Sequence, residues 1–296
     1  MSSPLPDQRR IDVSPALAGD LLRSADTLPL YENKDFYSTE LQSQVMDTVR
    51  ASSPDSFDAL VAGIKERLAQ WPYFVVVRGI RFDEGNRVFV AINRAFGELV
   101  ARPYEKPRAQ LVHYVQPETD RTSPRGGRES ERLHTDTADW DSPVELISMV
   151  CVRPDRNAGG RSIVMDVDTV RDEVNSRLGA DTLRVLETRP VPWQLASYFG
   201  GGVKWRTVLD GSSLRWRRYT IDLALEFEGA TLPSDVLNIL NAFEEVITDN
   251  DRSIDFLMRE GDLLFSDNHR TIHARTPVSD DAAADRLMIR SWIRTS

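Results

Sequence analysis

Residues 134–136 read His-Thr-Asp, and residues 268–273 read Asn-His-Arg-Thr-Ile-His. Side chains two residues apart on an extended strand share one face, so His134 and Asp136 can reach the same ligand. A distant histidine can complete a facial set of two nitrogens and one carboxylate oxygen. Mononuclear Fe(II) oxygenases use this set because it leaves coordination positions open for a cosubstrate and O2. The two segments therefore predict a metal centre.

The region around these segments has the pattern of short strands separated by turns. We expect helices at 168–187 and 234–248 and a hairpin of 204–209 with 214–221 around Asp210-Gly211. The expected strands are 146–152, 162–167, 254–258, 263–266, a stretch around His273, and 286–293. Strands from both ends of the region, with helices outside, favour a mainly β fold with flanking helices. Its core would be a double-stranded β-helix (jelly roll) rather than a βαβ sheet.

The chain before this region predicts a lead-in to the core. Residues 1–50 are rich in Pro, Ser and Asp, and we interpret them as an N-terminal surface arm with one short helix. In residues 51–132 we first expect a helix over 57–68, with Asp55 or Ser56 as its N-cap, and then a buried strand at 73–77. A second helix at 83–100 and a long polar loop at 101–132 would follow. With a jelly-roll core at 133–296 that carries helical insertions, we expect residues 1–296 to form a single domain.

The composition excludes several classes of protein. The chain has 296 residues, 41% of them hydrophobic, and a net charge of -9. This balance is ordinary for a globular domain and counts against a nucleic-acid partner. We find no apolar run of about 20 residues that would span a membrane and no signal peptide. The single cysteine, Cys151, lies in an apolar run and excludes an intrachain disulfide, so we expect a buried thiol and a cytoplasmic protein.

The strongest pattern combines three elements: His-x-Asp, a distant Asn-x-Arg-x-x-His, and Arg-x-x-x-Arg on a terminal strand. With this pattern the chain resembles the Fe(II)/2-oxoglutarate-dependent oxygenases of the taurine dioxygenase and clavaminate synthase-like superfamily. The resemblance runs from about Tyr73 to Arg290, and residues 73–79 resemble the early core strand of that family.

The resemblance implies roles for individual residues. His134, Asp136 and His273 match the ligands of Fe(II). The Gly-Gly-Arg-Ser sequence at 159–162 resembles a Gly-Gly-x-Thr segment, so the hydroxyl of Ser162 would contact 2-oxoglutarate. Arg286 matches the arginine that binds the distal carboxylate of 2-oxoglutarate, and Arg290 a second arginine on the same strand face. Fe(II) is thus the expected cofactor, 2-oxoglutarate and O2 are the expected cosubstrates, and succinate and CO2 the expected coproducts.

Several alternatives stay open. His269 has the same strand parity as His273, although the resemblance favours His273. Asn268 is expected to brace the ligand strand. The acidic ligand is Asp rather than Glu, which leaves the subfamily open. Halogenases of the superfamily carry a small residue at this position, so Asp136 favours hydroxylation, and desaturation or epoxidation would use the same ligands.

The substrate pocket is predicted from residues near these motifs. The candidates are His113, Gln116, Arg132, Trp140, Arg206, Arg217 and Arg218. The segment 205–219 is aromatic and cationic, which suggests a small anionic or zwitterionic substrate; a solvated basic hairpin is the alternative. The sequence Phe199-Gly200-Gly201-Gly202 could form a lid hinge.

Three functions compete on these grounds. The first is hydroxylation of an unactivated C–H bond in an amino acid or an amino-acid-derived intermediate. The second is taurine dioxygenase-like cleavage of a sulfonate or an ether. The third is a non-catalytic jelly-roll metal-binding protein, which the pair Arg286 and Arg290 disfavours because a bare metal site does not need them. The sequence leaves the substrate, the carbon attacked and the oligomeric state open.

Overall fold

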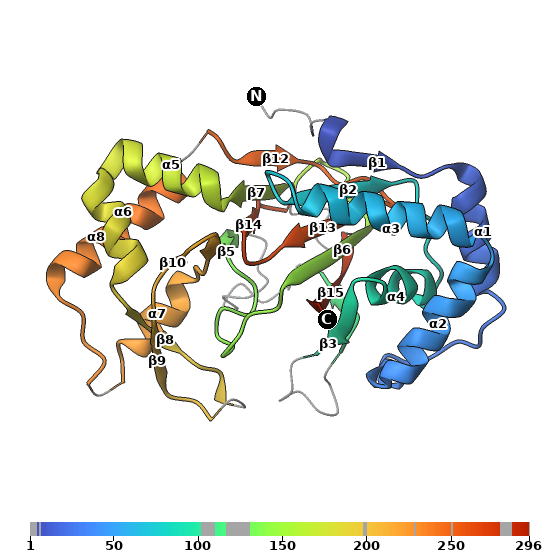
Figure 1. The fold of residues 1–296 in the computed structure, drawn as a ribbon, viewed down its shortest axis with the longest axis horizontal. Helices are drawn as coiled ribbons and strands as arrows, with labels where there is room; N and C mark the ends of the chain where they lie inside the picture. The colour runs from blue at the N-terminus through green and yellow to red at the C-terminus, as the bar shows by residue number, and fades with distance from the viewer. Residues whose placement is uncertain are drawn as a thin grey trace.

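Two β-sheets face each other between two groups of helices (Figure 1). The computed structural model describes residue 5 and residues 7–101, 110–116, 131–197, 200–227, 229–249, 251–278 and 286–295. Within this part of the chain, no helix is long and apolar enough to cross a membrane.

The larger sheet has the strand order β1-β2-β13-β6-β15-β3, and β4 also pairs with β15. Its strands are β1 (Arg10–Asp12), β2 (Phe74–Arg78), β3 (Gly97–Val100), β4 (His113–Val115), β6 (Leu146–Arg153), β13 (Leu263–Asp267) and β15 (Leu287–Thr295). Only the β1–β2 pair among these is parallel. The smaller sheet has the order β12-β7-β14-β5, with strands β5 (Glu131–His134), β7 (Ser162–Asp166), β12 (Ile254–Phe256) and β14 (Thr271–Arg275).

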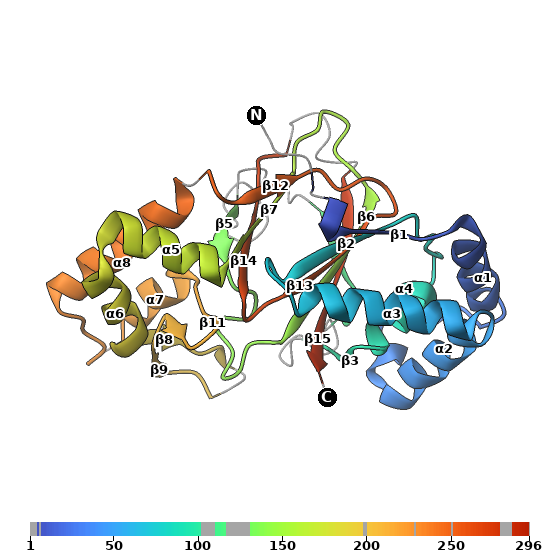
Figure 2. The ribbon, with the colours of Figure 1, turned by 45° about the horizontal axis from the view of Figure 1, so that its top comes forward.

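Each sheet has its own helical cover (Figure 2). The larger sheet packs against α1 (Pro15–Ala25), α2 (Thr39–Ala51), α3 (Pro54–Leu68) and α4 (Arg87–Arg94). The smaller sheet packs against α5 (Val167–Leu178), α6 (Ala180–Thr188), α7 (Arg218–Ala224) and α8 (Ser234–Thr248). Two hairpins join this second group: β8 (Val191–Gln194) with β9 (Val203–Arg206), and β10 (Leu209–Asp210) with β11 (Ser213–Leu214).

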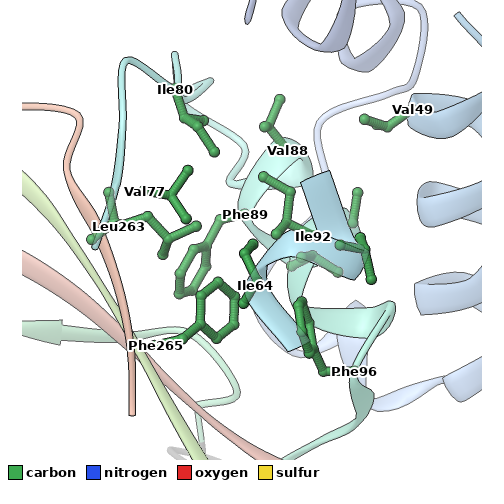
Figure 3. Close-up of a cluster of buried hydrophobic side chains, with 14 of the residues drawn as sticks. Val49, Ile64, Val77, Ile80, Val88, Phe89, Ile92, Phe96, Leu263 and Phe265 are labelled. Carbon is green, nitrogen blue, oxygen red and sulfur yellow. The ribbon is translucent and has the colours of Figure 1, made fainter. Parts of the chain in front are cut away.

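Alternation along the strands determines which residues face the space between the sheets. On β15, Ile289 and Ile293 pack into the helix-facing core, whereas Met288 and Trp292 belong to clusters on the opposite face. Figure 3 shows the helix-facing core, where Phe89 of α4 lies beside Phe265 of β13. The even-numbered residues of β15, including Arg290, are thereby directed towards the smaller sheet.

The expectation for residues 1–50 was wrong. They form two helices, α1 and α2, rather than a surface arm with one short helix, and β1 extends the larger sheet. Leu21, Phe36 and Val45 are fully buried in the helix-facing core. Packing therefore stabilises helices whose own sequence signal is weak.

Four further segments differ from the expectation. The helix expected at 83–100 ends at Arg94 and is followed by β3. The helix expected at 168–187 is broken into two at Gly179, whose φ is 88°. Residues 214–221 do not form a long strand: the hairpin around Asp210-Gly211 is two residues long on each side, and α7 begins at Arg218. The loop expected at 101–132 contains β4 and the start of β5.

The other elements are confirmed. The strands expected at 73–77, 146–152, 162–167, 254–258, 263–266, around His273 and at 286–293 correspond to β2, β6, β7, β12, β13, β14 and β15. The helices expected at 57–68 and 234–248 correspond to α3 and α8. The expected N-cap was wrong: α3 begins at Pro54 with Ser53 at the N-cap position, so Asp55 and Ser56 lie in its first turn. Cys151 is buried, as expected, and burial raises the pKa of its thiol to about 12.

Gly97 provides a test of how β15 is held. A Cβ atom at this position would lie 2.1 Å from the backbone oxygen of Arg294. We expect Gly97→Ala to lower the free energy of unfolding by about 1–3 kcal/mol, because backbone must move to accept the methyl group. Gly63→Ala is the matched control: it lies inside α3, its Cβ would meet nothing closer than 3.7 Å, and it should stabilise by up to about 1 kcal/mol. Equal unfolding midpoints in denaturant for both variants would contradict this reading.

Candidate metal centre

The two candidate histidine ligands lie on neighbouring strands of the smaller sheet. His134 on β5 is directly opposite His273 on β14, and the centroids of their rings are 4.5 Å apart. Cross-strand partners on one face lie this close because antiparallel pairing sets their separation. In Figure 1, β5 and β14 run side by side near the middle of the molecule. The register thus brings together residues that are far apart in the sequence.

Asp136 completes the cluster from the loop that follows β5. One ligand atom from each of His134, Asp136 and His273 lies within 4.8 Å of the others. The fully buried Asn268 holds this loop: its side-chain oxygen accepts from the Asp136 backbone N–H at 3.0 Å. Its amide nitrogen donates to the backbone oxygens of Asp136 at 3.0 Å and Val144 at 2.8 Å. Asn268 thus braces the loop that carries Asp136, whereas the sequence predicted that it would brace the strand of the distal histidine.

The carboxylate of Asp136 is buried yet held ionised. Burial by itself would raise its pKa, but Arg290, His134 and His273 hold the pKa well below its usual value. Nη1 of Arg290 lies 3.0 Å from Oδ2 of Asp136. An anionic oxygen beside two imidazoles is a donor set that suits a divalent transition metal, so these three residues could hold Fe(II).

His269 is directed away from the cluster. Its Nε2 atom lies 3.1 Å from the backbone oxygen of Pro143, and its backbone N–H donates to Asp267. The cluster of candidate ligands contains His273 and not His269. The geometry thus favours the assignment that the sequence left open between the two histidines.

Trp292 is a residue at this centre that the sequence reasoning missed. Its indole N–H donates to Oδ2 of Asp136 at 2.8 Å. Trp292 lies two residues after Arg290 on β15, so strand parity alone would have placed it on the same face. The larger sheet therefore supplies two donors to a ligand that the smaller sheet presents.

Arg286, which precedes β15, contacts Gly160 in the segment that leads into β7, the strand that Ser162 begins. Arg286 is 5% exposed, and its guanidinium donates to the backbone oxygen of Gly160 at 3.3 Å. A Cβ on Gly160 would lie 2.5 Å from Nε of Arg286, and the φ of Gly160 is 63°. Only glycine allows this close approach without strain. Ser162 begins β7 and is opposite Arg275 of β14.

Two of the substrate candidates contact the centre indirectly. The ring of His113, on β4, lies 4.7 Å from the ring of Trp292. Trp140 is buried and meets Trp292 edge to face at 5.7 Å. Both aromatic contacts place these side chains next to the residue that donates to Asp136.

The other candidates make contacts further out. Gln116 is exposed at the end of β4, and Arg132 is 3.6 Å from Glu244 with its side chain 77% exposed. Arg206 pairs with Asp141 at 2.7 Å, and Arg218 donates to Asp222 and Asn241 at 2.7 Å each. Arg217 is half-buried at the start of α7. The described contacts do not join these residues to the cluster. Arg121, Arg125, Arg128 and Phe199 of the expected loop and lid hinge lie outside the described residues.

The fold and the histidine–carboxylate cluster define the class of mononuclear non-haem iron dioxygenases. A family model described as "Taurine catabolism dioxygenase TauD, TfdA family" matches residues 38–292, and the chain belongs to this family. We conclude that the chain is a dioxygenase that uses iron and 2-oxoglutarate. Comparison with curated protein sequences finds no match.

Solved structures share the whole fold at low sequence identity. The non-heme iron oxygenase OrfP in complex with Fe and alpha-ketoglutaric acid is 17% identical, covers 99% of this chain and 95% of its own, and has a TM-score of 0.74. Asparagine oxygenase (AsnO) is 16% identical, covers 97% of this chain and 93% of its own, and has a TM-score of 0.71.

Proposed function

We propose that this chain hydroxylates an unactivated C–H bond of a small polar metabolite, an amino acid or an amino-acid-derived intermediate. The observation that carries the proposal is the convergence of His134, Asp136 and His273 between the two sheets. The solved neighbours support the substrate class. Asparagine oxygenase was crystallised with Fe(II), 2S,3S-3-hydroxyasparagine and succinate. OrfP was crystallised with Fe, succinate and (3S)-hydroxy-L-Arg.

In this proposal His134, Asp136 and His273 bind Fe(II). When bound, the iron would activate O2, which is the oxidant. Oxidative decarboxylation of 2-oxoglutarate to succinate and CO2 would supply two of the four electrons that O2 takes up, and the C–H bond would supply the other two. The chain's own residues do the positioning. Arg286 holds the distal carboxylate of 2-oxoglutarate through its planar donors, and the hydroxyl of Ser162 contacts the same cosubstrate. Arg290 compensates the charge of Asp136 and has donors left for a carboxylate of 2-oxoglutarate.

We also propose that the two facing sheets form a double-stranded β-helix and that residues 1–296 are a single oxygenase domain. The alternation of β15 supports this, because its two faces join two different cores. The N-terminal helices α1 and α2 pack into the same core as β13 and β15, which supports one cooperative unit.

A cationic group around Asp141, a few residues after the ligand Asp136 in the sequence, supports an anionic or zwitterionic substrate. Lys204, Arg206 and Arg215 gather around the single carboxylate of Asp141, which lies five residues after Asp136. Arg215 donates to the backbone oxygens of Trp140 at 3.4 Å and Asp141 at 3.3 Å. Burial and the neighbouring Arg206 lower the pKa of Arg215 to about 10. Lys204, Arg206 and Asp141 are partly exposed, whereas Arg215 is largely buried. An added anion next to Arg215 would be favoured, since buried charges are normally paired.

The substrate can be identified by turnover. We would screen free amino acids, acylated amino acids and sulfonates for substrate-dependent formation of succinate, and then truncate Arg206, Arg215, Arg217 and Arg218 to alanine one at a time. We expect an anionic or zwitterionic compound to be the best substrate. At least one truncation should raise its KM about 10-fold or more, which corresponds to about 1.4 kcal/mol.

Arg184→Ala is the matched control, because Arg184 lies on the exposed face of α6 and pairs only with Asp181 in the described part of the chain. A best substrate that is neutral and apolar, with no truncation affecting its turnover, would overturn the substrate proposal. The mass of the product separates the two enzymatic alternatives: the parent plus one oxygen indicates hydroxylation, and a cleaved fragment indicates attack next to a sulfonate or an ether.

A further inference from the structure

We propose that Trp292 is a positioning residue of the metal centre: its indole N–H holds Oδ2 of Asp136, so that Oδ1 alone faces the metal. This inference rests on the proposed function, because it requires that His134, Asp136 and His273 bind the iron. It adds a residue that neither the motif pattern nor the resemblance assigns.

The two oxygens of Asp136 have different surroundings. Oδ2 accepts from the indole N–H of Trp292 at 2.8 Å and from Arg290 at 3.0 Å. Oδ1 lies 3.4 Å from Nε2 of His134 and 3.9 Å from Nε2 of His273. Nη1 of Arg290 also lies 3.4 Å from Oδ1, so the larger sheet contacts both oxygens but holds Oδ2 more closely, and Oδ1 faces the two imidazoles. A carboxylate held in this way offers a metal one oxygen rather than two.

Trp292 is suited to fix this orientation. It is fully buried in β15, where it lies between Ile147 of β6 and Val100 of β3 in the sheet register. The ring is packed by Trp140 at 5.7 Å and by His113 at 4.7 Å. An indole N–H can only donate a hydrogen bond, so Trp292 is always the donor and Asp136 the acceptor. Rotation of the carboxylate would break a buried hydrogen bond to a charged acceptor, which is stronger than one between neutral groups.

Arg290 and Trp292 contribute in different ways. The guanidinium carbon of Arg290 lies 4.8 Å from the centroid of the Trp292 ring, so the ring also helps to hold the arginine over Asp136. Arg290 compensates charge and reaches both oxygens, at 3.0 and 3.4 Å. Trp292 is neutral and donates to Oδ2. It therefore fixes the orientation of the carboxylate and does not compensate its charge. Partners of metal ligands affect the metal through this kind of orientation.

The test removes the N–H and keeps an aromatic ring. We expect Trp292→Phe to bind Mn(II) about 10–100-fold more weakly than the wild-type chain in calorimetry. We also expect the visible spectrum of the Co(II)-loaded variant to change, because the released carboxylate can turn and ligate through both oxygens. A merely structural role would lower the melting temperature of the metal-free chain without changing that spectrum.

Trp193→Phe is the matched control. Trp193 on β8 is also fully buried, and its indole N–H donates to the backbone oxygen of Arg206 at 3.1 Å. The substitution removes the same ring volume and the same kind of bond at a site that does not touch Asp136, so Mn(II) affinity and the Co(II) spectrum should stay as in the wild type.

If Trp292→Phe fails to fold, benzothienylalanine at position 292 replaces only the N–H with sulfur and keeps the shape of the ring. Unchanged Mn(II) affinity and an unchanged Co(II) spectrum in either folded variant would overturn the inference. So would an equal loss of affinity in Trp193→Phe. A wild-type chain that binds no divalent metal would instead overturn the proposed function, so the two failures are distinguishable.

Discussion

Asp136→Asn is expected to bind Fe(II) at least about 100-fold more weakly than the wild-type chain and to form no succinate. The substitution removes the only carboxylate of the cluster and replaces an anionic donor by a neutral amide. Asparagine is preferable to alanine here, because alanine would leave the guanidinium of Arg290 without its partner in a largely buried site. An unpaired buried charge can cost about 3–5 kcal/mol of stability by itself. Anaerobic calorimetry with Fe(II) measures the binding, and succinate formation measures turnover.

The two nearby histidines give this prediction its control. His273→Ala should lose Fe(II) binding as Asp136→Asn does, because its ring lies in the cluster. His269→Ala should keep it, because Nε2 of His269 instead contacts the backbone oxygen of Pro143 at 3.1 Å. If His269→Ala abolished metal binding and His273→Ala did not, the assignment of the ligands would be wrong.

Local rules made the ligand cluster predictable from the sequence. The period of two along a strand predicts His134 and Asp136 on one face, and a distant histidine on an adjacent strand completes the set. In the structure β5 ends at His134, and Asp136 reaches the cluster from the loop that follows. The same rule predicts Arg286 and Arg290 on one face, but β15 begins at Leu287, and its register shifts between Leu287 and Met288. The period of two could not distinguish His269 from His273, however, because residues four apart on a strand lie on the same face. The choice depends on where β14 begins, and β14 starts at Thr271, which leaves His269 in the preceding turn.

Tertiary packing decided the parts that the sequence did not predict. The spacing of Val88, Ile92, Phe96 and Leu99 fits one helix, but α4 ends at Arg94 because Gly97 must approach the backbone of Arg294 within a sheet. Helices α1 and α2 form on a core made by strands far along the chain. The bond from Trp292 to Asp136 spans 156 residues, and no local pattern reports it.

Arg286→Ala is expected to raise the KM for 2-oxoglutarate far more than the KM for the substrate. Removing one partner of a buried charged pair costs about 2–5 kcal/mol, which corresponds to a roughly 30-fold or larger loss of affinity. Arg286 is 5% exposed, so water cannot replace its planar donors at the carboxylate. Arg161→Ala is the control, because Arg161 lies next to Gly160 in the sequence but pairs with Asp255 at 2.5 Å.

Gly160→Ala tests the same site without removing a charge. Its new Cβ would lie 2.5 Å from Nε of Arg286, so the guanidinium must move away from its place over the start of β7. A misplaced donor loses the bidentate geometry that a carboxylate needs, and we expect the same selective rise in the KM for 2-oxoglutarate. Calorimetric titration of the Mn(II)-loaded chain with 2-oxoglutarate separates this effect from any change in substrate binding. If Arg286→Ala and Gly160→Ala weakened the binding of substrate and 2-oxoglutarate equally, these residues would support the pocket as a whole and not the cosubstrate.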